Sequence, residues 1–134
     1  MRKSLATFVR RRAHERCEYC QLPRNSSTIE FEIDHIISLK HGGKTDANNL
    51  ALACFYCNSF KGPNIAGLDS LTGEVVRLFH PRKDKWDEHF VWDGAMLDGQ
   101  TAIGRVTVDV LGINDVEFIA VREALIAAGE FPPG

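Results

Sequence analysis

The sequence predicts an α+β protein with a core at residues 1–66 and a smaller α+β extension at residues 67–134. Three observations predict this class. Apolar residues recur at helical spacing near both ends of the chain, which predicts amphipathic helices there. Apolar and polar residues alternate at several places between them, which predicts short strands. Two C-x-x-C pairs enclose one of these alternating segments, so the segment between them must itself be folded.

Composition points to a soluble globular chain with one basic half. Of the 134 residues, 44% are hydrophobic and 25% are charged, which is ordinary for a globular domain. Residues 1–61 carry ten Lys and Arg against six Asp and Glu, whereas residues 62–134 carry six against twelve. This asymmetry favours a polyanion such as nucleic acid as the partner of the first half, although charged clusters are often only solvated faces. The sequence leaves protein partners open.

Nothing in the sequence predicts a membrane partner or secretion. No apolar run approaches the roughly 18 residues that a bilayer-spanning helix needs. The N-terminus lacks an apolar stretch followed by a small-residue cleavage site, so the expected location is the cytoplasm.

In the core, residues 4–16 predict a helix with an apolar face and crowded arginines. A tight turn at Cys17–Cys20 follows, and the alternation at 28–33 predicts a strand. A second short strand is expected at 36–39. After a polar, glycine-rich loop, residues 50–61 predict a helix that ends at Gly62-Pro63.

In the extension, residues 74–79 predict a strand after a turn at Thr72-Gly73. Strands are also expected at 90–97 and 101–106, joined through a hairpin turn at Asp98-Gly99. Residues 106–111 fit either a longer strand or a short helix. Asn114 and Glu117 are spaced as a helix-starting capping box, and Gly129 is a natural end for that helix.

The four cysteines form two C-x-x-C pairs, and none is left over. The pairs Cys17/Cys20 and Cys54/Cys57 can supply the four ligands of a tetrahedral zinc ion. Because four protein ligands close the coordination sphere, this Zn²⁺ should be structural. The alternative is a redox dithiol, which usually needs only one such pair.

Asp34-His35 follows the predicted strand, and alone this dipeptide indicates little. Its surroundings add Asn58 directly after Cys57, with Lys61 one helical turn further on the same face. Hydrolysis of a phosphodiester needs a base, a Lewis acid and cations that hold the backbone. His35 can act as the base, since its unperturbed pKa is about 6.5. Asp34 and Asn58 offer oxygen ligands that suit Mg²⁺ or Mn²⁺, and Lys61 can neutralise a phosphate.

The chain resembles the His-Asn-His (HNH) endonucleases, which are ββα-metal nucleases. The matching text is CEYC at 17–20 and EFEIDHIISLKHGGKTDANNLALACFYCNSFKG at 30–62. The resemblance implies a ββα-metal core with a four-cysteine zinc site, with His35 as general base and Asn49 bracing the loop between the strands. The third family position is Asn58 instead of His, an HNN variant that keeps an oxygen ligand. Family members often have Pro where this chain has Ser38.

The sequence also leaves alternatives open. The chain can be a non-catalytic, zinc-dependent nucleic-acid-binding module, or a nuclease directed at RNA instead of DNA. Four arginines near the first cysteine pair fit either a DNA-backbone contact or a solvated helix face: Arg10, Arg11, Arg12 and Arg16. His41 is expected to be a solvated loop residue. A second metal site at His80 and His89 matches no standard ligand spacing, and the aromatic residues around them are expected to pack in the core.

Overall fold

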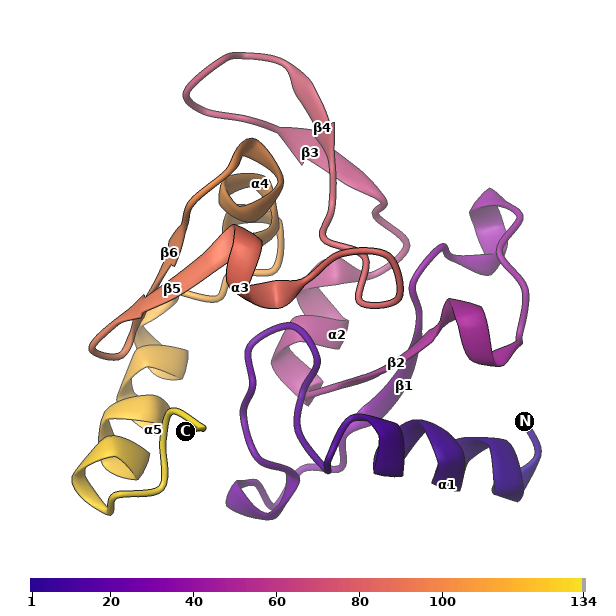
Figure 1. The fold of residues 1–134 in the computed structure, drawn as a ribbon, viewed down its shortest axis with the longest axis horizontal. Helices are drawn as coiled ribbons and strands as arrows, with labels where there is room; N and C mark the ends of the chain where they lie inside the picture. Colours follow the sequence, from indigo (N-terminus) through magenta and orange to yellow (C-terminus); the bar gives the residue numbers. More distant parts are fainter. Residues whose placement is uncertain (134) are drawn as a thin grey trace.

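A computed structural model describes residues 1–133 and confirms the α+β class. Within them lie three two-stranded antiparallel sheets and five α-helices, drawn in Figure 1. In chain order these are α1 (Lys3–Arg12), β1 (Glu32–His35), β2 (Leu50–Ala53), α2 (Phe55–Lys61), β3 (Ala66–Leu68), β4 (Val75–Arg77), α3 (Trp86–His89), β5 (Phe90–Asp93), β6 (Met96–Gly99), α4 (Ala102–Val110) and α5 (Val116–Ala127). Gly134, the end of the predicted extension, lies outside the described residues.

Helix α1 ends four residues earlier than the predicted helix at 4–16. His14 adopts a left-handed conformation with φ 55°, and its N–H donates to the carbonyl of Arg11. The N–H of Glu15 reaches back to the carbonyl of Arg10 at 3.1 Å. These two bonds form a Schellman motif, which satisfies the last carbonyls of the helix and reverses the chain. The reversal leads directly into the first cysteine pair.

Strands β1 and β2 pair antiparallel, with His35 opposite Leu50 and Glu32 opposite Ala53. The predicted strand at 28–33 is therefore displaced toward Asp34-His35. The expected second strand at 36–39 is wrong, because β2 comes from residues 50–53, which the sequence assigned to a helix. All four residues of β2 are buried. A short, fully apolar run fits a buried strand as well as a buried helix, so its period does not decide between them.

Helix α2 then begins at Phe55, directly after the Cys54 cap, whose sulfur accepts the N–H of Cys57. The helix packs against both strands, which completes a β-β-α unit. Helix α1 packs against β2 and lies along one side of this unit (Figure 1).

The extension differs from its prediction at two places. Its central hairpin turns at Gly94, φ 59°, and not at Asp98-Gly99. Residues 102–110 form helix α4, with Thr101 as its cap, so the strand expected at 101–106 is wrong. A Cβ on Gly99 would lie 2.4 Å from the backbone nitrogen of Arg105. Glycine at this position therefore allows β6 to pack closely against α4, and it does not form a turn. Strand β3 and helix α3 had no sequence prediction.

Helix α5 starts as the sequence indicated, but its cap is Asp115 instead of Asn114. Asn114 instead bonds both the N–H and the carbonyl of Leu97 at 2.8 Å, which fastens the central hairpin. Gly129, with φ 74°, follows the end of the helix as predicted.

One hydrophobic cluster runs through both parts of the chain. It includes Val9, Leu52 and Cys57 from the core, and Phe90 and Leu111 from the extension. No helix among residues 1–133 has the length and apolar character that crossing a membrane requires.

Candidate functional site

The four cysteines meet in one buried cluster. The first pair comes from the turn after α1, and the second from the junction of β2 and α2. Their sulfurs all lie within 4.8 Å of one another, and the Sγ atoms of Cys20 and Cys54 are 3.7 Å apart. A tetrahedral zinc ion with Zn–S bonds of about 2.3 Å places its sulfurs about 3.8 Å apart. The cluster is therefore positioned to hold zinc, and four protein ligands would close the coordination sphere of that ion.

The protonation of these thiols depends on their neighbours. Hydrogen bonds from adjacent thiols, together with burial, raise the pKa of Cys20 and of Cys57 well above the usual value. Hydrogen bonds from the same neighbours lower the pKa of Cys54. A bound dication favours thiolates at all four positions, so metal binding releases protons.

Asp34 lies at the centre of a second, oxygen-rich cluster. Its carboxylate is 5% exposed and accepts the hydroxyl of Tyr19 at 2.7 Å. The ammonium of Lys61 lies 3.2 and 3.1 Å from its two oxygens. Burial raises the pKa of Asp34, while Lys61 and Tyr19 oppose that rise. A carboxylate provides about four lone-pair sites, and Tyr19 and Lys61 already occupy sites on both oxygens.

Lys61 does not have the position that the sequence suggested. Its side chain is 1% exposed, and its ammonium also donates to the carbonyl of His35 at 3.0 Å. The predicted contact between Lys61 and a phosphate is therefore corrected: in this arrangement the ammonium is enclosed by β1 and cannot reach a nucleic-acid backbone.

His35 ends strand β1 and is half-buried. Its Nε2 lies 2.8 Å from the hydroxyl of Thr45, on the loop that joins the two strands. When Nε2 carries the ring proton and donates it to Thr45, the lone pair of Nδ1 is free to accept a proton. Thr45 thus orients the ring, a role that the sequence did not reveal because nothing local distinguishes this threonine.

Asn49 holds the same loop in shape. Its side-chain oxygen accepts the N–H of Ile37, and its amide nitrogen donates to the carbonyls of Ile37 and Lys44, each at 2.9 Å. Gly43 passes so close that a Cβ there would lie 1.8 Å from the oxygen of Ile37. Asn49 therefore braces the loop that presents Thr45 to the histidine.

Asn58 lies on α2, one turn before Lys61 and on the same helix face. It is half-buried, and among the described residues its side chain has no hydrogen-bond partner. Asn58 therefore lies on the face of α2 that also carries the cation of the Asp34 cluster. Tyr19, between the first two cysteines, also belongs to the Asp34 cluster, and the sequence indicated no role for it.

The four arginines divide into two kinds. Arg12 donates to the carbonyls of Ala47 and Leu50, at 2.8 and 2.7 Å, and its guanidinium stacks over Phe8. Arg16 donates to the carbonyl of Gln21. Both are committed to bonds within the protein. Arg10 and Arg11 have no such bond among the described residues, and Arg11 is exposed.

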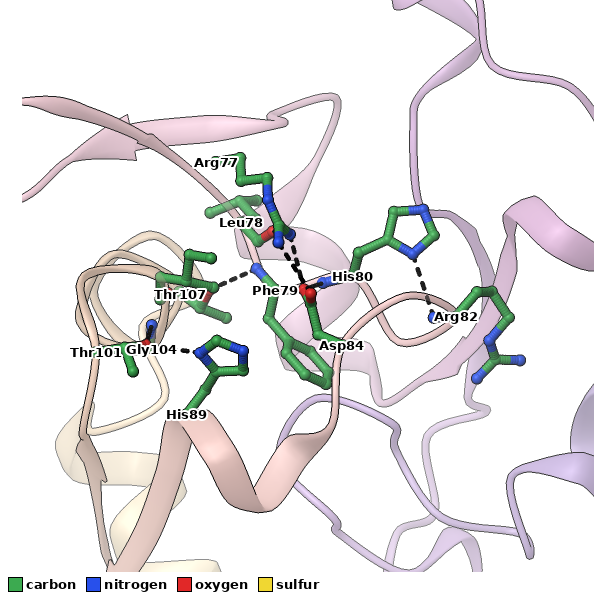
Figure 2. Close-up of polar contacts among 11 residues, drawn as sticks. Arg77, Leu78, Phe79, His80, Arg82, Asp84, His89, Thr101, Gly104 and Thr107 are labelled. Carbon is green, nitrogen blue, oxygen red and sulfur yellow. Dashed lines mark hydrogen bonds and ion pairs between the residues drawn. The ribbon is translucent and has the colours of Figure 1, made fainter.

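The histidines of the extension do not form a metal site in the described part of the chain, where the cysteines are the one metal-competent cluster. His80 accepts the N–H of Arg82 through Nδ1, whereas His89 bonds Thr101 at 2.7 Å, as Figure 2 shows. His41 is exposed, as expected. Trp86 and Trp92 pack against the core, also as expected.

Comparison with known proteins finds one family model that matches this part of the chain. Residues 17–64 match the family model of the HNH endonucleases, which confirms the resemblance. The matched segment contains all four cysteines, β1, β2 and α2, so the β-β-α unit corresponds to the ββα-metal core that the HNH family has. Searches of curated proteins and of solved structures found no match.

Proposed function

We propose that this chain, whose residues 17–64 carry an HNH endonuclease domain, is a metal-dependent endonuclease that hydrolyses phosphodiester bonds in DNA. The observation that carries the proposal is the pair His35–Thr45 at the end of β1, directly after Asp34 in the chain. It supplies an oriented base one residue from a carboxylate. The free, buried cysteines fit a reducing compartment, and we propose the cytoplasm.

In this proposal His35 takes the proton from the attacking water. Thr45 holds Nε2, so Nδ1 is the nitrogen that accepts this proton. General base catalysis by a histidine typically contributes about 10²–10⁴-fold to the rate. Asn49 keeps the loop in place so that Thr45 stays within bonding distance of the ring.

Asp34 and Asn58 are the residues that we assign to the catalytic cation. Two features support the assignment: Asn58 lies on the same face of α2 as Lys61, whose ammonium contacts Asp34, and the amide of Asn58 has no hydrogen-bond partner among the described residues. Oxygen ligands of this type suit Mg²⁺ or Mn²⁺. Such an ion, when bound, would supply the Lewis acid that stabilises charge on the phosphate.

Helix α1 is the surface that we assign to the nucleic-acid backbone. Its sequence contains four basic and no acidic residues. Lys3, Phe8 and Arg11 line an open groove along the helix, and Phe8 is 50% exposed. Exposed cations neutralise phosphates, and an exposed aromatic ring can stack on an unpaired base. Arg10 and Arg11 keep their predicted role, whereas Arg12 and Arg16 support the fold.

The proposal is tested by plasmid nicking with Mg²⁺ or Mn²⁺, comparing the wild type with His35→Ala. We expect the variant to lose at least about 100-fold of the rate, since the base is removed. His41→Ala is the matched control, because His41 is an exposed histidine of the loop that joins β1 to β2. Duplex, single-stranded and RNA substrates define the preference. Equal rates for wild type and His35→Ala would refute the proposal.

A second candidate is a zinc-dependent nucleic-acid-binding module without catalysis. One observation favours it: both oxygens of Asp34 are already engaged by Tyr19 and Lys61. This candidate predicts that the wild type shifts DNA in a gel but cuts no substrate with any divalent cation. The nicking assay with a panel of metals therefore separates the two.

A further inference from the structure

The cysteine cluster is covered by the C-terminal extension. A cavity of about 10 Å³ separates them, room for no more than about one water molecule. Its walls are Cys20, Cys54 and Cys57 on one side, and Ile113, Phe118, Val121 and Arg122 of the extension on the other. The cysteines therefore border a nearly dry cavity whose opposite wall is mostly apolar. The guanidinium-bearing residue Arg122 is the one charged residue in that wall.

A zinc ion with four thiolates carries a net charge of −2, and burial of that charge is costly unless something compensates it. Two backbone N–H groups point at the sulfurs: Cys20 donates to the Sγ of Cys17, and Cys57 donates to the Sγ of Cys54. These are partial charges. A full positive charge close to the sulfurs would compensate far more.

Arg122 lines this cavity together with the three cysteines. Its side chain is 2% exposed, and it donates to the carbonyls of Ala95 and Ile113 at 2.8 and 2.6 Å. The guanidinium also lies over the ring of Trp92, 5.1 Å from the ring centre. These contacts fix the group, yet none of them is an ion pair. Arg122 is thus a buried cation whose bonded partners, among the described residues, are all neutral.

The thiolates are the negative groups that act on it. Burial lowers the pKa of Arg122, and the charges of Cys20, Cys57 and Cys54 oppose that effect. A guanidinium stays protonated at any ordinary pH, so its charge is permanent. The geometry and the electrostatics therefore pair Arg122 with the metal centre.

We infer that Arg122 is the charge partner of the zinc-thiolate centre, and that helix α5 sets how firmly the protein retains its zinc. The extension is then a part of the metal site, supplied from the far end of the chain. This inference is independent of the proposed nuclease activity, since it concerns only the cysteine cluster and its cover.

The test measures zinc release from the full chain to a chromogenic chelator, for the wild type, Arg122→Met and Arg122→Lys. We expect Arg122→Met to release zinc about 10- to 100-fold faster, because truncation of a buried charged partner acts mainly on the dissociation rate. Arg122→Lys, which keeps the charge, should stay within a few-fold of the wild type. Arg2→Met is the control, since Arg2 is exposed and does not line the cavity beside the cysteines.

Two further measurements separate charge from cover. With Co²⁺ in place of zinc, the sulfur-to-cobalt absorption band should shift in Arg122→Met and return in Arg122→Lys, which loss of packing alone would not produce. Val121→Ala loosens the same cover but keeps the charge, so it should release zinc more slowly than Arg122→Met. The inference is wrong if Val121→Ala and Arg122→Met release zinc equally fast, or if Arg122→Met matches the wild type. Should Arg122→Met fail to fold, Arg122→Lys decides: release more than about tenfold faster than wild type would also overturn the inference.

Discussion

Lys61 and Asp34 form a buried ion pair where α2 packs against β1. Both side chains are almost inaccessible, and Tyr19 completes the cluster with its hydroxyl. Such a pair places two requirements on the protein. Each charge needs the other because neither reaches water, and the carboxylate must still be available if it binds a catalytic cation. Single residues of this kind decide whether the site is catalytic or only a stable core.

Replacing Lys61 by Met should therefore lower the free energy of unfolding by about 3–5 kcal/mol, since it leaves a buried carboxylate without its partner. Urea denaturation in the presence of zinc measures the change. Lys44→Met is the matched control, because Lys44 is exposed in the loop and should change stability by less than about 0.5 kcal/mol. A Lys61→Met protein as stable as the control would show that the pair is dispensable.

At the scale of elements, short segments depend on polar contacts from elsewhere in the chain. The loop between β4 and α3 is an example (Figure 2). The carboxylate of Asp84 accepts hydrogen bonds from both terminal nitrogens of Arg77 and from the backbone N–H of His80. Thr107 of α4 accepts the N–H of Phe79 at 2.9 Å. These bonds fix the conformation of a loop that lacks regular structure. The His80 side chain is buried within this loop.

His80 should make stability depend on pH. Burial, followed by the nearby Lys83, lowers the pKa of its ring in the folded state. In the unfolded chain the ring titrates near about 6.5. As the pH falls, the ring therefore takes up a proton in the unfolded state before it does so in the folded state. Protonation of His80 has no effect on the free energy of unfolding above about pH 6.5, and it lowers that free energy below this pH.

Urea denaturation at about pH 7.5 and about pH 5.8 brackets the unfolded-state pKa of about 6.5. Between these two pH values, the free energy of unfolding should fall less for His80→Gln than for the wild type. His41→Gln, in which an exposed ring is changed, should behave like the wild type. The zinc thiolates titrate in all three proteins, so the comparison isolates the ring. Identical losses in His80→Gln and wild type would contradict the prediction.

At the scale of the whole molecule, the two parts share more than a covalent connection. The indole N–H of Trp86 donates to the carbonyl of Tyr19, and that of Trp92 donates to Gln21, both at 2.8 Å. Both partners lie in or beside the first cysteine turn, and Arg122 lies against the cysteine cluster. The division at residues 66 and 67 remains a prediction about domains, but the contacts across it favour one cooperative unit.

Unfolding should accordingly be a single transition. The chain has two tryptophans, and both are in the extension, so their fluorescence reports the extension while zinc release reports the core. In urea the two curves should coincide, because loss of either part exposes the core that they share. A change in tryptophan fluorescence that is complete before any zinc is released would show two independent units.

The sequence by itself determined the α+β class, the four-cysteine metal cluster and the segment that matches the HNH family. Those features rest on spacing along the chain: a C-x-x-C pair brings two sulfurs to one ion wherever it folds, and Asn58 and Lys61 share a helix face in any helix. The tertiary structure decided which residue meets which partner.

Only the fold made residues 50–53 a buried strand, since a short apolar run satisfies either period. Only the fold buried Lys61 against Asp34 and brought Thr45 to His35. It also carried Arg122 from the far end of the chain to the cysteines. A side chain's chemistry is local, whereas its burial and its partners depend on contacts between segments distant in sequence, and no local pattern encodes those contacts.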